Sequence, residues 1–170
     1  MKRTFSLILL PILLLAGCSA KPASQLTAQE RTELYRSAIQ DARDQDANDA
    51  YPIITSDTDD MAPLLLELMG LSAGDMSAYA ISASAMNVRA YGVAAVYPAE
   101  GRDEAVKEAL QGFVDRQKQS FEQYLADQYD IAANARLETL EDGTILLVMC
   151  DGQDEVFTAI RSAVEAGTKG

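Results

Sequence analysis

The placement of cysteine limits the fold of this chain more than any other feature of its sequence. The 170 residues include two cysteines, Cys18 and Cys150. Cys18 closes an N-terminal segment in which Lys2-Arg3 precedes an apolar stretch over residues 5–15. That stretch of about eleven residues is shorter than the ~20 that a helix needs to cross a bilayer, so it indicates a secretory signal. The fold must therefore form from the residues that follow.

The residues that end at Cys18 resemble the lipobox of bacterial lipoproteins. They read Leu15-Ala16-Gly17-Cys18. In such a motif the cysteine thiol is the nucleophile that accepts a diacylglycerol group, and the small residues fit the peptidase that cleaves before it. The sequence therefore predicts a signal peptide over residues 1–17, lipid attachment at Cys18, and a location on the extracytoplasmic face of the bacterial cell membrane.

The mature chain is expected to be a short tether followed by one domain. Residues 18–26 are mostly polar and contain Pro22, so they are typical of a tether, and the eight residues after Cys18 reach at most ~28 Å. Residues 27–170 have the length of a single domain. Once Cys18 is acylated, Cys150 is the one thiol left, so this domain cannot form an internal disulfide. Cys150 ends an apolar run, where a thiol usually behaves as a small buried hydrophobe.

The charge of the chain excludes two classes of partner. The formal net charge is −12, and removal of Lys2 and Arg3 with the signal peptide makes it −14. A surface of this charge is repelled by the phosphates of nucleic acids and by anionic lipid. We therefore expect no nucleic acid partner, and contact with the membrane through the lipid on Cys18 alone. A cationic partner is electrostatically easier, although acidity also serves solubility.

Hydrophobic periodicity predicts an α+β fold. Thr27-Ala28-Gln29-Glu30 reads as a capping box, and Gly70 as a helix C-cap. Asp142-Gly143 lies between two apolar runs and predicts a hairpin. The expected elements are helices over 28–49, 59–69, 103–126 and 153–165, and strands over 77–84, 88–97, 136–140 and 144–150. The order α-α-ββα-ββα predicts one antiparallel sheet of about four strands, packed with helices and preceded by two N-terminal helices.

The second expected strand offers a candidate binding face. Alternation along it places Arg89, Tyr91, Val93 and Tyr97 on one face and small apolar residues on the other. The small face suits close helix packing, so we assign it to the main core. We expect the helices over 103–126 and 153–165 to cover one side of the sheet. The two N-terminal helices either cover the tyrosine face or leave it open as a partner site.

Few residues offer catalytic or metal chemistry. The chain has no histidine, which removes Ser-His-Asp and Cys-His nucleophile systems and the commonest general base near neutral pH. Asp44, Asp46 and Asn48 match the first three ligands of a calcium loop. Asp49 stands where that loop needs glycine, and Thr55 where it needs a bidentate acid. We therefore expect neither a metal nor a cofactor, and no enzyme activity.

Several loose motifs between about Leu64 and Val156 carry a family resemblance. They are a strand pair around Ser84-Ala85-Met86-Asn87-Val88-Arg89-Ala90, then Gln117-x-x-x-Phe121-x-x-Tyr124 with Leu125, then Ile131 and Asn134-Ala135, and an apolar strand before Cys150-Asp151. In these the chain resembles the bacterial lipoprotein family known as domain of unknown function 4358. The resemblance implies a lipoprotein context and no established activity.

These features together predict a function of a general kind. We expect a lipid-anchored extracytoplasmic domain that binds a protein or peptide of the cell envelope without catalysis. The alternative is a solute-binding or carboxylate-dependent hydrolytic lipoprotein that acts on envelope material. A deep polar pocket with paired carboxylates would favour the alternative.

Overall fold

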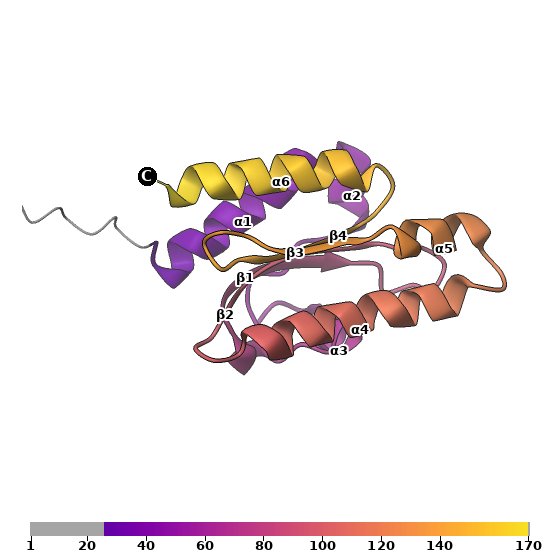
Figure 1. Cartoon of the computed structure of the whole chain (residues 1–170), viewed down its shortest axis with the longest axis horizontal. Coiled ribbons are helices and arrows are strands. Elements are labelled where there is room, and N and C mark those ends of the chain that lie inside the picture. The colour runs from indigo at the N-terminus through magenta and orange to yellow at the C-terminus, as the bar shows by residue number, and fades with distance from the viewer. Residues whose placement is uncertain (1–25, 170) are drawn as a thin grey trace, which may run out of the picture.

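The computed structural model describes residues 26–169 as one sheet between two layers of helices (Figure 1). The elements in chain order are α1 (Ala28–Ala42), α2 (Gln45–Ala50), α3 (Ala62–Met69), a short 3-10 turn (Ala73–Asp75), β1 (Met76–Ala83), β2 (Gly92–Pro98), α4 (Asp103–Phe121), α5 (Ala126–Ala133), β3 (Arg136–Thr139), β4 (Ile145–Met149) and α6 (Gln153–Thr168). The expected α+β class, with one antiparallel sheet of four strands, is confirmed.

The order of strands in the sheet is β1-β2-β4-β3, and every neighbouring pair is antiparallel. β4 therefore lies inside the sheet although it is the last strand of the chain. Its five residues are all buried, because helices cover both of its faces. The outer edge of β1 is partly closed by Ile54, which exchanges two backbone hydrogen bonds with Ile81.

The two faces of the sheet are covered by different helices. α1 and α6 lie on one face, and α3 and α4 lie on the other (Figure 1). Our expectation that the two helices over 103–126 and 153–165 share a face was wrong. Phe113 of α4 packs over Gly92, where an added Cβ would lie 2.5 Å from its ring, so α4 takes the small face. Tyr35 of α1 and Phe157 of α6 are buried together on the opposite face.

The helix expected over 28–49 is broken into α1 and α2. Its start is as predicted: the Thr27 amide donates to Glu30 at 2.8 Å, and the Glu30 amide donates to the Thr27 hydroxyl at 3.2 Å. At Arg43 the backbone becomes extended, and the Asp44 side chain accepts from the Ala47 amide to begin α2. Asp and Asn side chains favour such caps over helix interiors, which explains the break.

Two further boundaries differ from expectation. α4 ends at Phe121 rather than near 126, and the unexpected helix α5 follows. β2 begins at Gly92 rather than 88, because residues 84–91 form a loop in which Val88 is exposed. The Gln128 side chain of α5 accepts a hydrogen bond from the Ala90 amide at 2.9 Å and so ties α5 to this loop. Both differences shape one end of the molecule.

Candidate functional site

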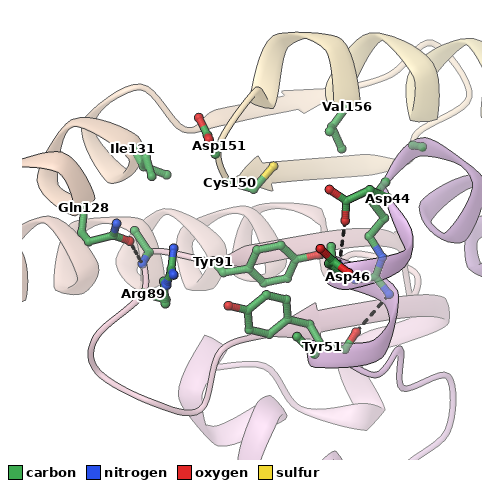
Figure 2. A pocket seen from close by; sticks show the side chains of 15 residues that line it. Asp44, Asp46, Tyr51, Arg89, Tyr91, Gln128, Ile131, Cys150, Asp151 and Val156 are labelled. Carbon is green, nitrogen blue, oxygen red and sulfur yellow. Dashed lines mark hydrogen bonds between the residues drawn. The ribbon is translucent and has the colours of Figure 1, made fainter.

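A pocket of about 380 Å³ opens at the end of the sheet where α2, α5, the loop 84–91 and the turn between β4 and α6 meet (Figure 2). Its walls come from segments far apart in sequence. The lining residues are Ala42, Arg43, Asp44, Asp46, Ala47, Ala50, Tyr51, Arg89, Ala90, Tyr91, Gln128, Ile131, Cys150, Asp151 and Val156. The volume lies at the lower end of the range for small-ligand sites, about 300–1,000 Å³.

Two stacked tyrosines form one side of the pocket. The rings of Tyr51 and Tyr91 lie 3.9 Å apart between centroids with an angle of 15° between their planes. Tyr51 directly follows α2, and Tyr91 directly precedes β2. Tyr91 is 8% exposed, and burial raises the pKa of its hydroxyl, an effect that the nearby Arg43 opposes. The stack gives the pocket a flat aromatic surface.

Arg43 holds this wall together from the break between α1 and α2. Its Nη1 donates to the hydroxyls of Tyr91 at 2.6 Å and Ser82 at 2.8 Å. Its Nη2 donates to the Tyr51 carbonyl at 3.0 Å, and its Nε to Asn48 Oδ1 at 2.8 Å. All four acceptors are uncharged, so the positive charge of this half-buried side chain is not neutralised by its hydrogen-bond partners.

Charged side chains of both signs surround the stack. Asp44, Asp46, Asp151 and Arg89 are exposed and line the pocket with Arg43. Within residues 26–169, none of these five side chains takes part in an ion pair. The pocket therefore combines an aromatic surface with unpaired carboxylates and unpaired guanidinium groups.

Cys150 lies in the pocket wall but is not an activated nucleophile. It is 7% exposed, and burial, with a contribution from Asp151, raises the pKa of its thiol from 9.0 to about 11. A thiol is nucleophilic as the thiolate, and that form is scarce at neutral pH when the pKa is this high. The structure agrees with the expectation that Cys150 packs as a small buried side chain.

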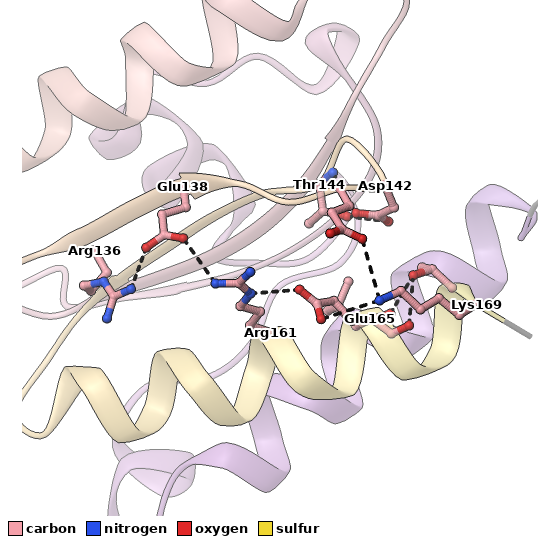
Figure 3. Close-up of polar contacts among 10 residues, drawn as sticks. Arg136, Glu138, Asp142, Thr144, Arg161, Glu165 and Lys169 are labelled. Carbon is pink, nitrogen blue, oxygen red and sulfur yellow. Dashed lines mark hydrogen bonds and ion pairs between the residues drawn. The ribbon is translucent and has the colours of Figure 1, made fainter.

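A second polar cluster lies at the opposite end of the same sheet face. Arg31 of α1 forms an ion pair with Asp142 and stacks over the Tyr97 ring at 4.0 Å. The Tyr35 hydroxyl lies 2.6 Å from the Thr144 hydroxyl, and burial raises the pKa of Tyr35 to about 12. Nearby, a surface chain of ion pairs joins the edge strand β3 to α6 (Figure 3). These contacts fasten helices to the sheet.

The four residues of the predicted binding face fall in different environments. Val93 is fully buried, and Tyr91 nearly so, because α1 and α6 cover this face. Tyr97 is half-buried beneath Arg31. Arg89 is exposed in the loop 84–91. The open-face alternative is thus wrong for the strand itself, whereas Arg89 and the edge of Tyr91 line the pocket. Cys18 lies outside the described residues.

The calcium-like segment forms a helix instead of a loop. Asp44 caps α2, and the Asn48 side chain donates to the Gln40 carbonyl at 3.0 Å. Asp46 is exposed at the pocket. Over residues 26–169, no three side chains of His, Cys, Asp or Glu are arranged to hold a metal ion.

Sequence reasoning missed most of the pocket. Arg43 and Tyr51 lay in segments interpreted as helix and link, and Gln128 belongs to a helix that we did not expect. Arg43 and Tyr51 are 8 positions apart, but the contacts that join them to Tyr91, and Ala90 to Gln128, span 38 to 48 positions and follow no short-range pattern. The usable signals were strand alternation, which singled out Arg89 and Tyr91, and the polar residues at the predicted helix end near Asp44.

Comparison with known proteins identifies a family. A family model described as a domain of unknown function (DUF4358) matches residues 54–150. That segment runs from the Ile54 bridge to Cys150 and includes the whole sheet with α3, α4 and α5. Neither a curated protein nor a solved structure matches the chain significantly. The matched segment supplies one part of the pocket wall, and α1, α2, α6 and Tyr51 supply the other.

Proposed function

We propose that this chain, which belongs to the DUF4358 family, is a lipid-anchored extracytoplasmic domain that binds a protein or peptide of the cell envelope without catalysis. The family description names no activity, so the proposal rests on the chain itself. The observation that carries it is the pocket around Tyr51 and Tyr91, which pairs an aromatic surface with charged groups on its rim. Aromatic and arginine side chains in such pockets are frequent anchors of protein recognition.

The position of the pocket suits a tethered protein. The described chain begins at Leu26, beside the N-terminus of α1 (Figure 1). The pocket is lined by Ala42 and Arg43 at the other end of that helix. The 15 residues of α1 extend about 22 Å. A lipid at Cys18 would therefore hold the opposite end of the domain near the bilayer and leave the pocket facing away. Within the described residues, no helix is both long enough and apolar enough to span a membrane.

The available side chains support binding over catalysis. The sequence has no histidine, and the thiol of Cys150 has a pKa of about 11. The hydrolytic alternative would depend on Asp44, Asp46 and Asp151. A carboxylate pair needs defined spacing around a scissile bond, about 5–10 Å in glycosidases. Asp44 is engaged as the cap of α2, so it suits a structural role better than proton transfer.

Site-specific crosslinking in the native membrane tests the proposal. A photoreactive benzoylphenylalanine replaces Ala50, which lines the pocket, or Gln111, which is exposed on α4 in the other helix layer. We expect discrete adducts from position 50 and none from position 111. No adduct from position 50, or the same adducts from both, would contradict a protein partner at the pocket. Turnover of the captured partner that stops in an Asp46→Asn variant would favour the hydrolytic alternative.

A separate experiment tests the anchor. We expect Cys18→Ala to leave an unprocessed precursor that takes up no labelled fatty acid, because the acceptor thiol is gone. Cys150→Ala is the matched control and should be processed and acylated normally. Acylation of the Cys18→Ala protein would show that the lipid is carried elsewhere or that the motif has been misinterpreted.

A further inference from the structure

We infer that the pocket binds a short peptide that carries both a free ammonium group and a free carboxylate, with the carboxylate at Arg89 and the ammonium group at Asp46. The inference deepens the proposed binding function and rests on it. It names the chemistry of the ligand, which neither the family description nor the overall charge of the chain supplies.

The unpaired charges are the first support. Elsewhere within residues 26–169, five of the six other arginines form ion pairs with carboxylates, as Arg31 does with Asp142 and as the β3–α6 surface shows (Figure 3); Arg116 is the exception. The five charged side chains of the pocket stay apart although they line one cavity. A ligand with both charges would neutralise both kinds of group at once, whereas a singly charged ligand would leave one kind without a partner.

The arrangement around the tyrosines is the second support. Figure 2 shows Arg89 and Gln128 on one side of the Tyr91 ring, and Asp44 and Asp46 on the side to which its hydroxyl points. The two carboxylates there outnumber the single positive charge of Arg43. A peptide lying along the ring would meet opposite charges at its two ends. Its middle would pack on apolar surface from Val156, Ile131 and the tyrosine stack.

The size of the pocket limits the ligand. A volume of about 380 Å³ suits a small ligand or the end of a peptide, not a folded surface. Arginine presents a planar fork of donors that fits a carboxylate. Arg89 is exposed in a loop and forms no ion pair within the described residues, although its charge reaches the Asp127 carboxyl. Asp46 is exposed as well, and its carboxylate can accept from an ammonium group at the pocket rim.

A panel of dipeptides tests the inference directly. The probes are the twenty Ala-Xaa dipeptides with free ends, each with its N-acetylated and C-amidated derivatives, measured by calorimetry on the intact domain. We expect at least one free dipeptide to bind, and either blocking group to weaken Kd by tenfold or more. The inference is overturned if no free dipeptide binds at 10 mM (about 3 kcal/mol of binding free energy). It is also overturned if blocked and free forms bind equally.

Two exposed variants assign the ends of the ligand. In Arg89→Gln the free dipeptide should bind tenfold more weakly, and C-amidation should then change Kd less than twofold. In Asp46→Asn the free dipeptide should also bind tenfold more weakly, and N-acetylation should then change Kd less than twofold. The matched controls are Lys107→Gln and Asp49→Asn, which are exposed and do not line the pocket, and they should bind as the unaltered domain does. If Arg89→Gln instead abolished the effect of N-acetylation, and Asp46→Asn the effect of C-amidation, the proposed orientation of the ligand would be wrong.

The two proposals fail in different ways. Adducts from position 50 together with no dipeptide binding would retain the binding function and reject the ligand chemistry. Dipeptide binding together with no adducts would retain the ligand chemistry and reject a protein partner of the envelope at this pocket.

Discussion

The two faces of the sheet are closed by different means. On the α3–α4 face the contact is one of shape: Gly92 lets the ring of Phe113 approach the strand closely, and the surrounding side chains are almost all apolar. On the α1–α6 face, buried polar groups join the helix to the sheet, with Arg31 and Tyr35 at one end and Arg43 at the other. Apolar packing is non-directional, whereas hydrogen bonds fix positions. The face that fixes positions is also the one that borders the pocket.

The largest effect on the free energy of unfolding is expected on the α3–α4 face. Phe113→Ala should lower the free energy of unfolding by about 3–5 kcal/mol, because the side chain is fully buried and leaves a cavity. Gly92→Ala should cost about 1–3 kcal/mol by overpacking against the same ring. Urea denaturation measures both.

Gly74→Ala is the matched control, since the nearest atom to its added Cβ is 4.0 Å away. If Gly92→Ala were tolerated as well as Gly74→Ala, close packing at this position would not hold the α4 face.

The next effect concerns the buried ion pair of the polar face. Arg31→Met keeps much of the side-chain volume but leaves the Asp142 carboxylate, 17% exposed, without its partner. We expect a loss of about 3 kcal/mol in the free energy of unfolding. Arg36→Met breaks the exposed pair with Glu33 on the same helix and should cost less than about 1 kcal/mol. Equal costs would indicate that α1 is held by apolar packing alone.

Two tyrosines compare the faces most directly. Tyr35→Phe should cost about 1–2 kcal/mol, because it removes the buried hydrogen bonds of the Tyr35 hydroxyl to Thr144 and Arg31, which then keep only their hydrogen bonds with Asp142. Tyr79→Phe on the other face should change stability by less than about 0.5 kcal/mol or increase it. The buried Tyr79 hydroxyl has no hydrogen-bond partner among the described residues. If Tyr79→Phe lost more stability than Tyr35→Phe, hydrogen bonding would matter more on the α3–α4 face than on the α1–α6 face, contrary to our expectation.

The contribution of Tyr35 to stability depends on pH, and the sign of this dependence follows from its pKa. Folding raises the pKa of Tyr35 from 10.0 to about 12, so the folded state holds this proton more tightly than the unfolded chain does. Its contribution to stability is fully present below pH 10 and is lost as the pH rises from about 10 to about 12. Stability measured across that range should fall less steeply in Tyr35→Phe than in the unaltered domain.

The last prediction concerns the reactivity of Cys150 in the pocket wall and not stability. In a Cys18→Ala protein, the Cys150 thiol should react with iodoacetamide at pH 8 roughly a hundredfold more slowly than an ordinary thiol, because its pKa is about 11. Unfolding in urea should restore the ordinary rate. Fast labelling of the folded protein would show that the polar face opens as far as Cys150.

Local sequence signals predicted the elements well and their partners poorly. The capping box at Thr27, the Gly70 cap with φ of 72° and the hairpin at Gly143 all depend on a few adjacent residues, and all three were predicted. The break at Arg43 had a local signal, the Asp44 cap, that was overlooked, whereas the contacts of Arg43 with Ser82 and Tyr91, 39 and 48 positions away, leave no local signal. The assignment of helices to faces failed for the same reason.

The candidate site was predicted only at two of its residues. Arg89 and Tyr91 were singled out from strand alternation, yet the strand begins after them and they act from a loop. Tyr51 gave no signal, because its stacking partner is 40 positions away and aromatic residues in links are common. Pockets assembled from distant segments leave little trace in short sequence windows.

Because β4 lies inside the sheet, the sheet cannot be completed until the C-terminal part of the chain has been made. β2 gains its second neighbour, and α1 gains α6, only after residues near the C-terminus have been made. Until then the long helix α4 and the β1–β2 hairpin have no complete core, and contacts between distant parts of a chain close slowly. The N-terminal half therefore exposes apolar surface until β4 and α6 have been synthesised. Chains in that state tend to aggregate or need a chaperone. A domain cut short before β4 would lack its central strand as well as its end.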